Sequence, residues 1–226
     1  MASQTVTQFT YLRLKPDVKP EDPNNEAGEA FLNVLRTAKQ QSGYQGSSWG
    51  RTIEDRDNVV WVVDWADARG AARTNEIRHF LDASTEMITF YVSLIPSLAG
   101  TDVLTKNPVT ELVGLAFPSD MSPDEHKKVN SDLIAFRTAL LEHMDKNARA
   151  ISWSMGHVSR PGTVDHASSP SGKALVHMLA VGWESVEAHK AARETQVFAD
   201  VIKPLREKML PPPKGVEMRH AKLNKI

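Results

Sequence analysis

The chain has 226 residues, a formal net charge of -1 at pH 7 and no cysteine. The near-neutral charge argues against a nucleic-acid surface or an anionic membrane as the main partner, and the lack of cysteine excludes disulfides and thiol catalysis. No apolar run is long enough for a membrane span, and residues 1–16 lack the apolar core of a signal peptide. We therefore expect a cytoplasmic protein without nucleic-acid or membrane partners.

Two parts of the sequence resemble each other in the same order along the chain. Residues 6–14 lie over 109–117 at an offset of 103, and residues 62–68 lie over 180–186 at an offset of 118. The offset changes at 159–173, a loop rich in Gly, Pro and Ser. A change confined to one loop indicates two diverged copies, so we expect two domains, 1–106 and 107–226.

Each copy reads as strand, helix, strand, strand, helix, strand. In the first copy a helix is expected before Gly43, a residue that suits the position after a helix end. A second helix is expected from just after Trp65 to about Pro96, because its apolar positions recur at helical spacing. The strands of this copy are expected at 6–14, 44–53, 58–66 and 100–105.

The second copy repeats this order with clearer helix signals. Ser122 and Glu125 bracket Pro123 in a capping box that predicts the start of a helix. Trp183 ends a strand, and Ser185 is placed to cap the helix that follows, so the indole is expected to fill a strand-to-helix corner. The strands of this copy are expected at 109–117, 150–158, 174–183 and 216–223.

Several strands are apolar on both faces, as in Val59 to Val63 and Leu175 to Val181. Such strands need cover on both sides, and helices can cover one face of a sheet only. The other copy's sheet is the available cover for the second face. We therefore predict an α+β fold of tandem ferredoxin-like βαββαβ repeats whose antiparallel sheets form an intramolecular α/β barrel.

The strand ending in Gly-Trp-Glu-Ser-x-Glu-Ala-His-x-Ala (182–191) resembles the dimeric α/β-barrel proteins. It is most similar to their antibiotic-biosynthesis-monooxygenase type, in the tandem form found in fungi. The resemblance covers both halves and is strongest in 175–200. Members of that family include cofactor-free oxygenases acting on polycyclic phenols, haem-degrading enzymes, aldol cyclases and isomerases. The resemblance implies a small-molecule pocket between the sheet and the helices of one unit, and leaves the reaction open.

The sequence lacks the usual signatures of metal and nucleotide sites. His143 and Asp145 fall two positions apart on an expected helix, where their side chains diverge. No His-Glu-x-x-His, no Gly-x-Gly-x-x-Gly and no P-loop occurs. Residues 152–156 (Ser-Trp-Ser-Met-Gly) lack the first glycine of a nucleophile elbow. We expect no bound metal and no cofactor.

The first copy holds the candidate catalytic residues. Tyr11 and Arg13 share one face of the first strand, Asp64 lies on the third, and His79 follows in the second helix. In aldol-cyclase relatives a histidine near this place does acid–base work, so the resemblance suggests His79 as the base. Asp64 would orient it, and Tyr11 or Arg13 would stabilise the resulting anion. The alternative is a surface histidine at a helix end.

Pocket walls are expected from aromatic and imidazole side chains in both copies. The candidates are Trp49, Tyr91, Trp153, His157 and His177. Small residues, including Gly114 and Ala116, lie on the opposite faces of these strands. They either allow close packing or leave a cavity, and the alternation of side chains along a strand does not show which of the two occurs. His189 is expected to face solvent, and His220 lies in a surface-like context.

Together these features predict an enzyme of secondary metabolism that acts on a hydrophobic aromatic or polyketide-derived molecule. Its chemistry would be cofactor-independent, with base abstraction followed by monooxygenation or by cyclisation. The alternative is a non-catalytic small-molecule-binding or stress-response barrel, in which the polar residues are scattered. A third possibility is that the second half carries the site, with His157 in it. A monomer or a homodimer is expected.

Overall fold

The computed structural model describes residues 5–67, 69–70 and 75–226. The strands are β1 (Val6–Arg13), β2 (Tyr44–Arg51), β3 (Asn58–Trp65), β4 (Ile88–Val92), β5 (Val109–Pro118), β6 (Ser152–Arg160), β7 (Val164–Asp165), β8 (Lys173–Trp183), β9 (Arg219–Ala221) and β10 (Asn224–Lys225). The helices are α1 (Glu26–Arg36), α2 (Val103–Lys106), α3 (Pro123–Thr138), α4 (Val186–Arg193) and α5 (Gln196–Arg206). Short 3-10 or π turns lie at Thr37–Gln40, Asn75–Phe80, Ala139–His143 and Lys146–Ala148.

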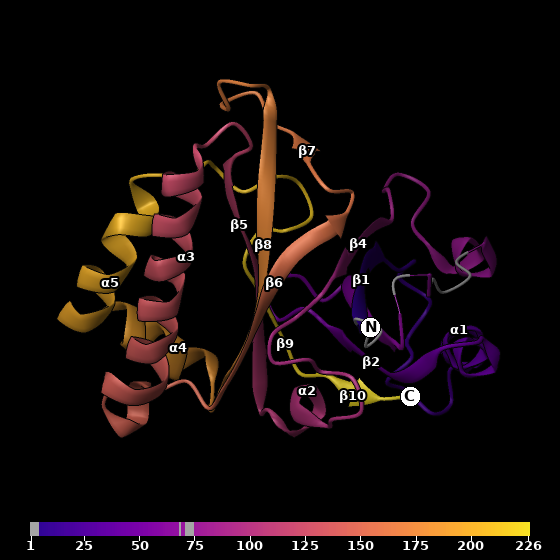
Figure 1. Cartoon of the computed structure of the whole chain (residues 1–226). Helices are drawn as coiled ribbons and strands as arrows, with labels where there is room; N and C mark the ends of the chain where they lie inside the picture. The colour runs from indigo at the N-terminus through magenta and orange to yellow at the C-terminus, as the bar shows by residue number, and fades with distance from the viewer. Residues whose placement is uncertain (1–4, 68, 71–74) are drawn as a thin grey trace.

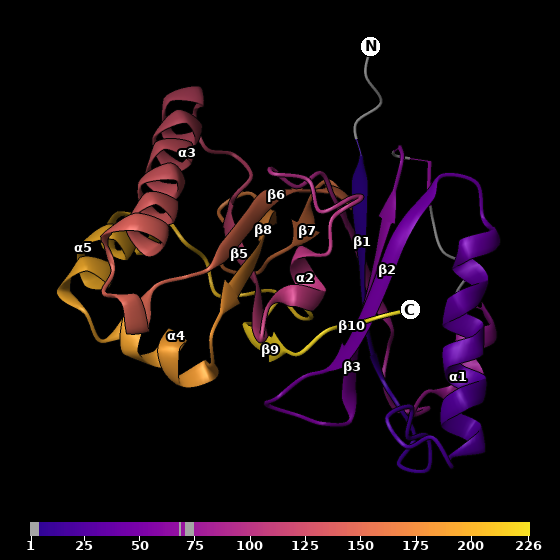
Figure 2. The ribbon, with the colours of Figure 1, turned by 90° about the horizontal axis from the view of Figure 1, so that it is seen from below.

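The described strands form one curled antiparallel sheet in the order β10-β2-β3-β1-β4-β6-β8-β5-β9, with β7 beside β8. The two outer members, β9 and β10, follow each other in the C-terminal segment, and Ala221 also bridges to Thr52. This segment therefore links the two ends of the sheet. Helices α3, α4 and α5 lie on one flank and α1 on the other, with the strands between them (Figures 1 and 2).

The inner faces of the strands share one hydrophobic core. Phe9, Val62 and Phe90 from the first half pack in the same cluster as Leu112 and Met178 from the second. The expectation that strands of the two halves share a core is confirmed, although they belong to one continuous curled sheet and not to two separate sheets. The outer faces pack against the helices in two separate clusters, one in each half.

Glycines permit close contact where the two halves meet. A Cβ on Gly156 of β6 would lie 2.1 Å from the carbonyl oxygen of Ser93, and one on Gly50 of β2 would lie 2.2 Å from that of Lys222. Gly114 likewise faces inward, where a Cβ would meet Val216. The small side chains of the second half therefore serve close packing inside the curled sheet and do not leave ligand space there.

The first half departs from the predicted element order after Trp65. The expected helix running to Pro96 is wrong, because Asn75–Phe80 forms a 3-10 turn and Ile88–Val92 forms β4. The run Ile-Thr-Phe-Tyr-Val favours a strand through its β-branched and aromatic residues. Residues 68 and 71–74, where that helix was expected to begin, lie outside the described residues. The strand expected at 100–105 is also wrong, since Val103–Lys106 is helical.

The second half follows the helix signals closely. Ser122 caps α3 and the Glu125 carboxylate accepts from the Ser122 backbone at 2.9 Å, which completes the capping box. Ser185 Oγ accepts from the Ala188 backbone at 3.1 Å, as predicted for the start of α4. Thr195 caps a further helix, so the predicted single helix is two. Within the described ranges, every helix is too short or too polar to traverse a bilayer.

Candidate functional site

A cavity of about 140 Å³ lies in the second half between the outer face of the sheet and helices α3 and α5. Its aromatic walls come from Phe136, Trp153 and Phe198. The other lining residues are Glu111, Val113, Leu115, Leu140, Leu179, Val181, His189, Arg193, Ile202, Arg206, Met209 and Met218. An apolar pocket with a few convergent polar groups has the composition of a small-molecule site.

Glu111 is the acidic group of this cavity. It lies on β5 between Val109 and Val113, on the face that packs against the helices, and it is only 7% exposed. The indole Nε1–H of Trp183 donates to its Oε2 at 3.0 Å. Burial raises the Glu111 pKa to about 7, although the hydrogen bond from Trp183 and the charge of Arg193 act in the opposite direction. The carboxyl group is therefore poised to take or give a proton near neutral pH.

His189 stands next to this carboxyl group. The cap at Ser185 starts α4 directly after the strand, and the His189 ring stacks on Trp183 with centroids 4.7 Å apart. Its Nε2 lies 3.6 Å from Glu111 Oε2. Burial, with a smaller contribution from the charge of the nearby His220, lowers the His189 pKa to about 3. The pair is thus a neutral imidazole beside an acid, since burial disfavours both charges.

The expectation that His189 faces solvent is wrong. The side chain is 3% exposed, because Ala188, His189 and Ala192 form the buried face of α4. The surface context expected for His220 is also wrong, since β9 pairs it directly across from Glu111 and leaves it 3% exposed.

His220 extends the polar group toward the surface. Its Nε2 lies 2.8 Å from His189 Nδ1, and its Nδ1 lies 2.5 Å from Glu54 Oε1. The His220 backbone N–H also donates to the Glu54 carboxylate. Burial alone would raise the Glu54 pKa, but the backbone and ring hydrogen bonds from His220 outweigh it and lower the pKa. The Glu54 side chain is 42% exposed, so the connected groups run from the cavity to solvent.

The first half has a counterpart of the indole contact without the acid. Trp65 Nε1 donates to Gln8 Oε1 at 3.2 Å, and Gln8 and Trp65 are the positions that the sequence repeat places over Glu111 and Trp183. A glutamine amide fills the same structural role and does not titrate. The ionisable group therefore distinguishes the second-half site.

Tyr11 and Asp64 lie on the inner face of the sheet but far apart. Thr7 is the strand partner of Asp64 and Val60 that of Tyr11, which separates them by roughly 13 Å along the strand. Thr7 Oγ1 donates to Asp64 at 2.7 Å, and burial raises the Asp64 pKa to about 6. The Tyr11 hydroxyl is buried without a hydrogen-bond partner among the described residues, and burial raises its pKa. The two side chains line separate hollows.

His79 lies apart from both of them, and Arg13 borders the same hollow as Tyr11. His79 is exposed in the 3-10 turn whose buried residue, Ile77, packs with the helix-facing cluster of the first half, on the opposite side of the sheet from Asp64. Arg13 pairs with Asp55 at 2.7 Å and Asp57 at 2.5 Å near the strand end. The structure thus does not bring the four predicted catalytic residues to one cavity, and their roles remain predictions.

Of the predicted wall residues, Trp153 lines the second-half cavity. The His157 and His177 rings lie 3.8 Å apart at another part of the same sheet face, where burial lowers the pKa of both. Tyr91 lies on β4, beneath the guanidinium of Arg160 at 3.6 Å.

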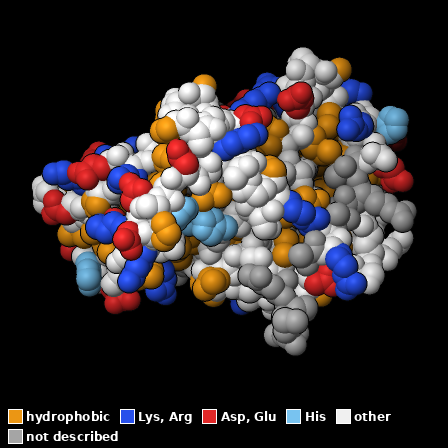
Figure 3. Space-filling view, turned by 45° about the horizontal axis from the view of Figure 1, so that its top comes forward, with side chains coloured by type: hydrophobic (Ala, Val, Ile, Leu, Met, Phe, Trp, Pro, Cys, Tyr) orange, Lys and Arg blue, Asp and Glu red, His pale blue; other side chains and the backbone are white. Residues whose placement is uncertain are grey.

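Trp49, the remaining predicted wall residue, borders a shallow hollow beside Arg51. Among the described residues no group of three or more His, Cys, Asp or Glu side chains is arranged to hold a metal ion. Acidic, basic and histidine side chains are interspersed over the face in Figure 3, without an extended patch of one charge.

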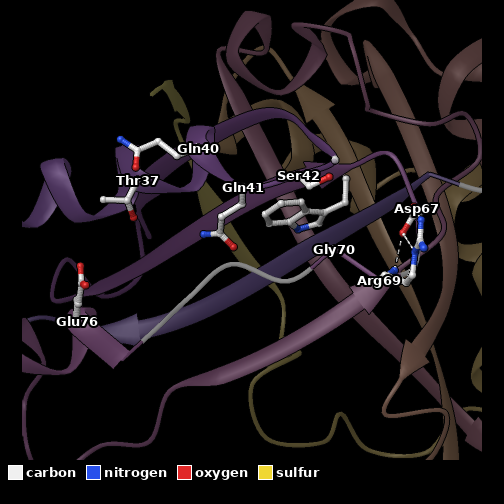
Figure 4. Close-up of a pocket in the computed structure, with 10 residues that line it drawn as sticks. Thr37, Gln40, Gln41, Ser42, Asp67, Arg69, Gly70 and Glu76 are labelled. Carbon is white, nitrogen blue, oxygen red and sulfur yellow. Dashed lines mark hydrogen bonds and ion pairs between the residues drawn. The ribbon is translucent and has the colours of Figure 1, made fainter.

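A larger hollow of about 740 Å³ lies in the first half beside Trp65 (Figure 4). Its drawn side chains are mostly polar, and Arg69 bonds to Asp67. The hydrogen bonds from Arg69 lower the Asp67 pKa to about 2, so this carboxylate stays ionised and does not serve as a proton carrier at neutral pH. The cavity at Glu111 is therefore the better candidate site, although it is smaller.

No family model matches the chain, and no curated protein matches it. Among solved structures, a "Putative monooxygenase" from Fusobacterium nucleatum subsp. nucleatum is 11% identical, with a TM-score of 0.54 over 100% of this chain and 94% of that one. A "Putative Chlorite dismutase" is 11% identical, with a TM-score of 0.59 over 98% and 96%. An "anthrone oxidase-like protein" is 12% identical, with a TM-score of 0.53 over 99% and 94%. These neighbours have α+β barrel folds, and at such identities the likeness shows the fold alone.

Proposed function

We propose that this protein is an enzyme that uses Glu111 as a general base on a small aromatic substrate bound in the second-half cavity, without a cofactor. The observation that carries the proposal is the buried carboxyl group with a pKa raised to about 7, which opens into an aromatic cavity. A base of this pKa is half ionised near neutral pH. A large share of the carboxylate is then free to take a proton, and its affinity for that proton is higher than that of an ordinary carboxylate.

The proposed chemistry is the oxidation of an activated CH₂ group to a carbonyl. Glu111 takes one proton from a carbon next to both an aromatic ring and a carbonyl, and the electron pair delocalises onto the carbonyl oxygen. The Nε1–H of Trp153, which is buried without a partner among the described residues, would donate to that oxygen. The carbanion adds O₂, the peroxide takes up a proton, and loss of water with the second C–H proton leaves a ketone. The balance is R₂CH₂ + O₂ → R₂C=O + H₂O.

The names of two structural neighbours, a "Putative monooxygenase" and an "anthrone oxidase-like protein", support the oxidative outcome. The same carbanion could instead attack a second carbonyl and close a ring, which is the cyclisation alternative. Both outcomes begin with the same proton transfer to Glu111.

The volume of the cavity limits the size of the substrate. A volume of about 140 Å³ is below the roughly 300–1,000 Å³ of sites for drug-sized ligands. This favours a molecule of one or two rings over the polycyclic substrates that the family resemblance suggested. Arg193 and Arg206 also line the cavity and would attract a substrate with an acidic group.

We extend the proposal to the chain's organisation. Residues 1–106 and 107–226 would be tandem ferredoxin-like repeats of the fungal antibiotic-biosynthesis-monooxygenase type, active in secondary metabolism. The matching indole contacts of Gln8 with Trp65 and of Glu111 with Trp183 support two related units. The first would be structural and the second catalytic.

The test is oxygen uptake with small aromatic carbonyl compounds whose CH₂ lies between the ring and the carbonyl, such as the lactone 2-coumaranone and the ketone 2-indanone. Glu111→Gln is expected to lower kcat by about 100-fold or more, and the exposed His79→Ala is expected to leave it unchanged. Full activity of the Glu111 variant would overturn the proposal. If only the His79 variant lost activity, the result would support the catalytic site predicted in the first half.

The scattered polar residues of the first half are what a non-catalytic binder predicts. That alternative is favoured if the wild-type protein binds these carbonyl compounds but neither consumes oxygen nor exchanges their benzylic protons with D₂O.

A further inference from the structure

We infer that His189, His220 and Glu54 form a proton path that connects the buried carboxyl group of Glu111 with solvent. Its use in turnover rests on the proposed function, but the path itself is a property of the resting protein. The four side chains come from four separate parts of the sequence: the turn after β2, β5, the first half of α4, and β9. The tertiary fold alone aligns them.

The contacts admit one consistent order of donors and acceptors. Glu54 accepts the Nδ1–H of His220 at 2.5 Å, which leaves His220 Nε2 as an acceptor. His189 Nδ1–H then donates to that nitrogen at 2.8 Å, which leaves the lone pair of His189 Nε2 facing Glu111 Oε2 at 3.6 Å. Every donor in this row points toward the surface, so a proton leaving Glu111 meets an acceptor at each step.

Transfer along the row balances without a charged histidine. The Glu111 proton passes to His189 Nε2, the Nδ1 proton of His189 passes to His220 Nε2, and the Nδ1 proton of His220 passes to Glu54. Each imidazole forms one N–H bond and breaks another, so each ends as its neutral second tautomer. This agrees with the burial that disfavours an imidazolium at His189.

The gap at Glu111 is the slow point of the path. A distance of 3.6 Å is longer than the roughly 2.6–3.2 Å at which a proton moves directly, so the carboxyl group must approach His189 by about 0.5 Å. The side chain has room to do so, because Glu111 and His189 both border the cavity.

The other charged groups near the proton path do not give the proton a second route to solvent. Arg193 of α4 acts on both Glu111 and His189 through its charge, but it has no proton acceptor. Glu187 interacts with His220 through its charge alone, and its carboxylate bonds to Ser185. Glu54 is thus the acid at the end of the row.

The experiment follows the Glu111 proton by infrared spectroscopy in the absence of substrate. The C=O stretch of the protonated carboxyl group is identified at pH 6 as the band missing from Glu111→Gln. Rapid mixing into D₂O then gives the rate at which this band moves to its deuterated position. Glu54→Gln keeps an oxygen that accepts from His220 but cannot take up a proton, so it is expected to slow the exchange by about tenfold or more.

The matched control is Glu86→Gln, the same substitution at another glutamate. The Glu86 side chain is 83% exposed and pairs with Lys214, which is not part of the proton path. It is expected to exchange at the wild-type rate. His220→Gln, which can hydrogen-bond but cannot change tautomer, serves as a second variant and is expected to slow exchange as Glu54→Gln does.

Wild-type exchange rates in both path variants would overturn the inference, because the proton would then leave through the cavity mouth. The absence at pH 6 of any band that depends on Glu111 would also overturn it. Wild-type exchange rates in the path variants do not bear on turnover, so loss of oxygen uptake in Glu111→Gln would then still support the proposed function, whereas a missing Glu111 band would count against both. Slow exchange in the path variants, with full turnover in Glu111→Gln, would support the path and refute the proposed function.

Discussion

Replacing Glu111 with Gln is expected to stabilise the protein at alkaline pH. The ordinary pKa of this carboxyl group is 4.5, and burial raises it to about 7 in the folded protein. A pKa that differs by one between the folded and unfolded states corresponds to about 1.4 kcal/mol, so the total linkage amounts to about 3 kcal/mol. Gln8 already shows that an amide can accept the hydrogen bond of a buried Trp at this type of corner, so the substituted side chain fits the site.

The direction of the pH dependence follows from proton binding. The folded state holds the Glu111 proton more tightly than the unfolded state does. This group therefore contributes its full stability below pH 4.5, and the contribution is lost as the pH rises to about 7. His189 acts in the opposite direction, because its lowered pKa costs stability as the pH falls from 6.5 toward 3. That effect is present in both proteins and largely cancels in their difference.

The assay is urea unfolding of the wild type and Glu111→Gln at intervals between pH 5 and pH 8, followed by tryptophan fluorescence. The free energy of unfolding of the variant minus that of the wild type should increase by about 2–3 kcal/mol from pH 5 to pH 8. Glu86→Gln, a change at an exposed acid, should show no such gain. A difference between Glu111→Gln and wild type that stays constant from pH 5 to pH 8 would refute the raised pKa, and with it the choice of Glu111 as base.

Two further predictions concern packing. Gly156→Ala should destabilise the contact between β4 and β6 by about 1–3 kcal/mol, because the added methyl group meets the Ser93 carbonyl oxygen at 2.1 Å. Thermal unfolding checks this against Gly46→Ala, where a Cβ would meet no atom within 4 Å; equal melting temperatures would contradict it. Phe198→Ala should cost about 3–5 kcal/mol and enlarge the cavity, so that two-ring ligands bind more tightly relative to one-ring ligands in calorimetric titration. Unchanged relative affinity would show that ligands bind elsewhere.

Local features of the fold could be predicted from the sequence because they depend on neighbouring residues. The caps at Ser122 and Ser185 need only a side-chain oxygen within three residues of a free backbone N–H. Apolar residues at both parities of β3 and β8 also require burial on both faces, wherever the cover comes from.

The part of the first half after Trp65 could not be predicted in this way. The run Ile88–Val92 is apolar and short, and periodicity does not separate a short buried helix from a strand. In the structure this run is a strand because it pairs with β1 on one side and with β6 on the other. His79 consequently lies in an exposed turn and not on a helix over a pocket.

The sequence by itself determined the order of most strands, the helix starts of the second half and the need for a core between the two halves. It also contained a hint of the candidate site: Glu111 is a lone acid between Val109 and Val113 on an otherwise apolar strand face. Only the tertiary structure decided that His189 and His220 meet this acid, since α4, β9 and β5 are distant along the chain. The physical reason is that burial and proton affinity depend on which groups surround a side chain in space, whereas capping and strand alternation depend on neighbours in sequence.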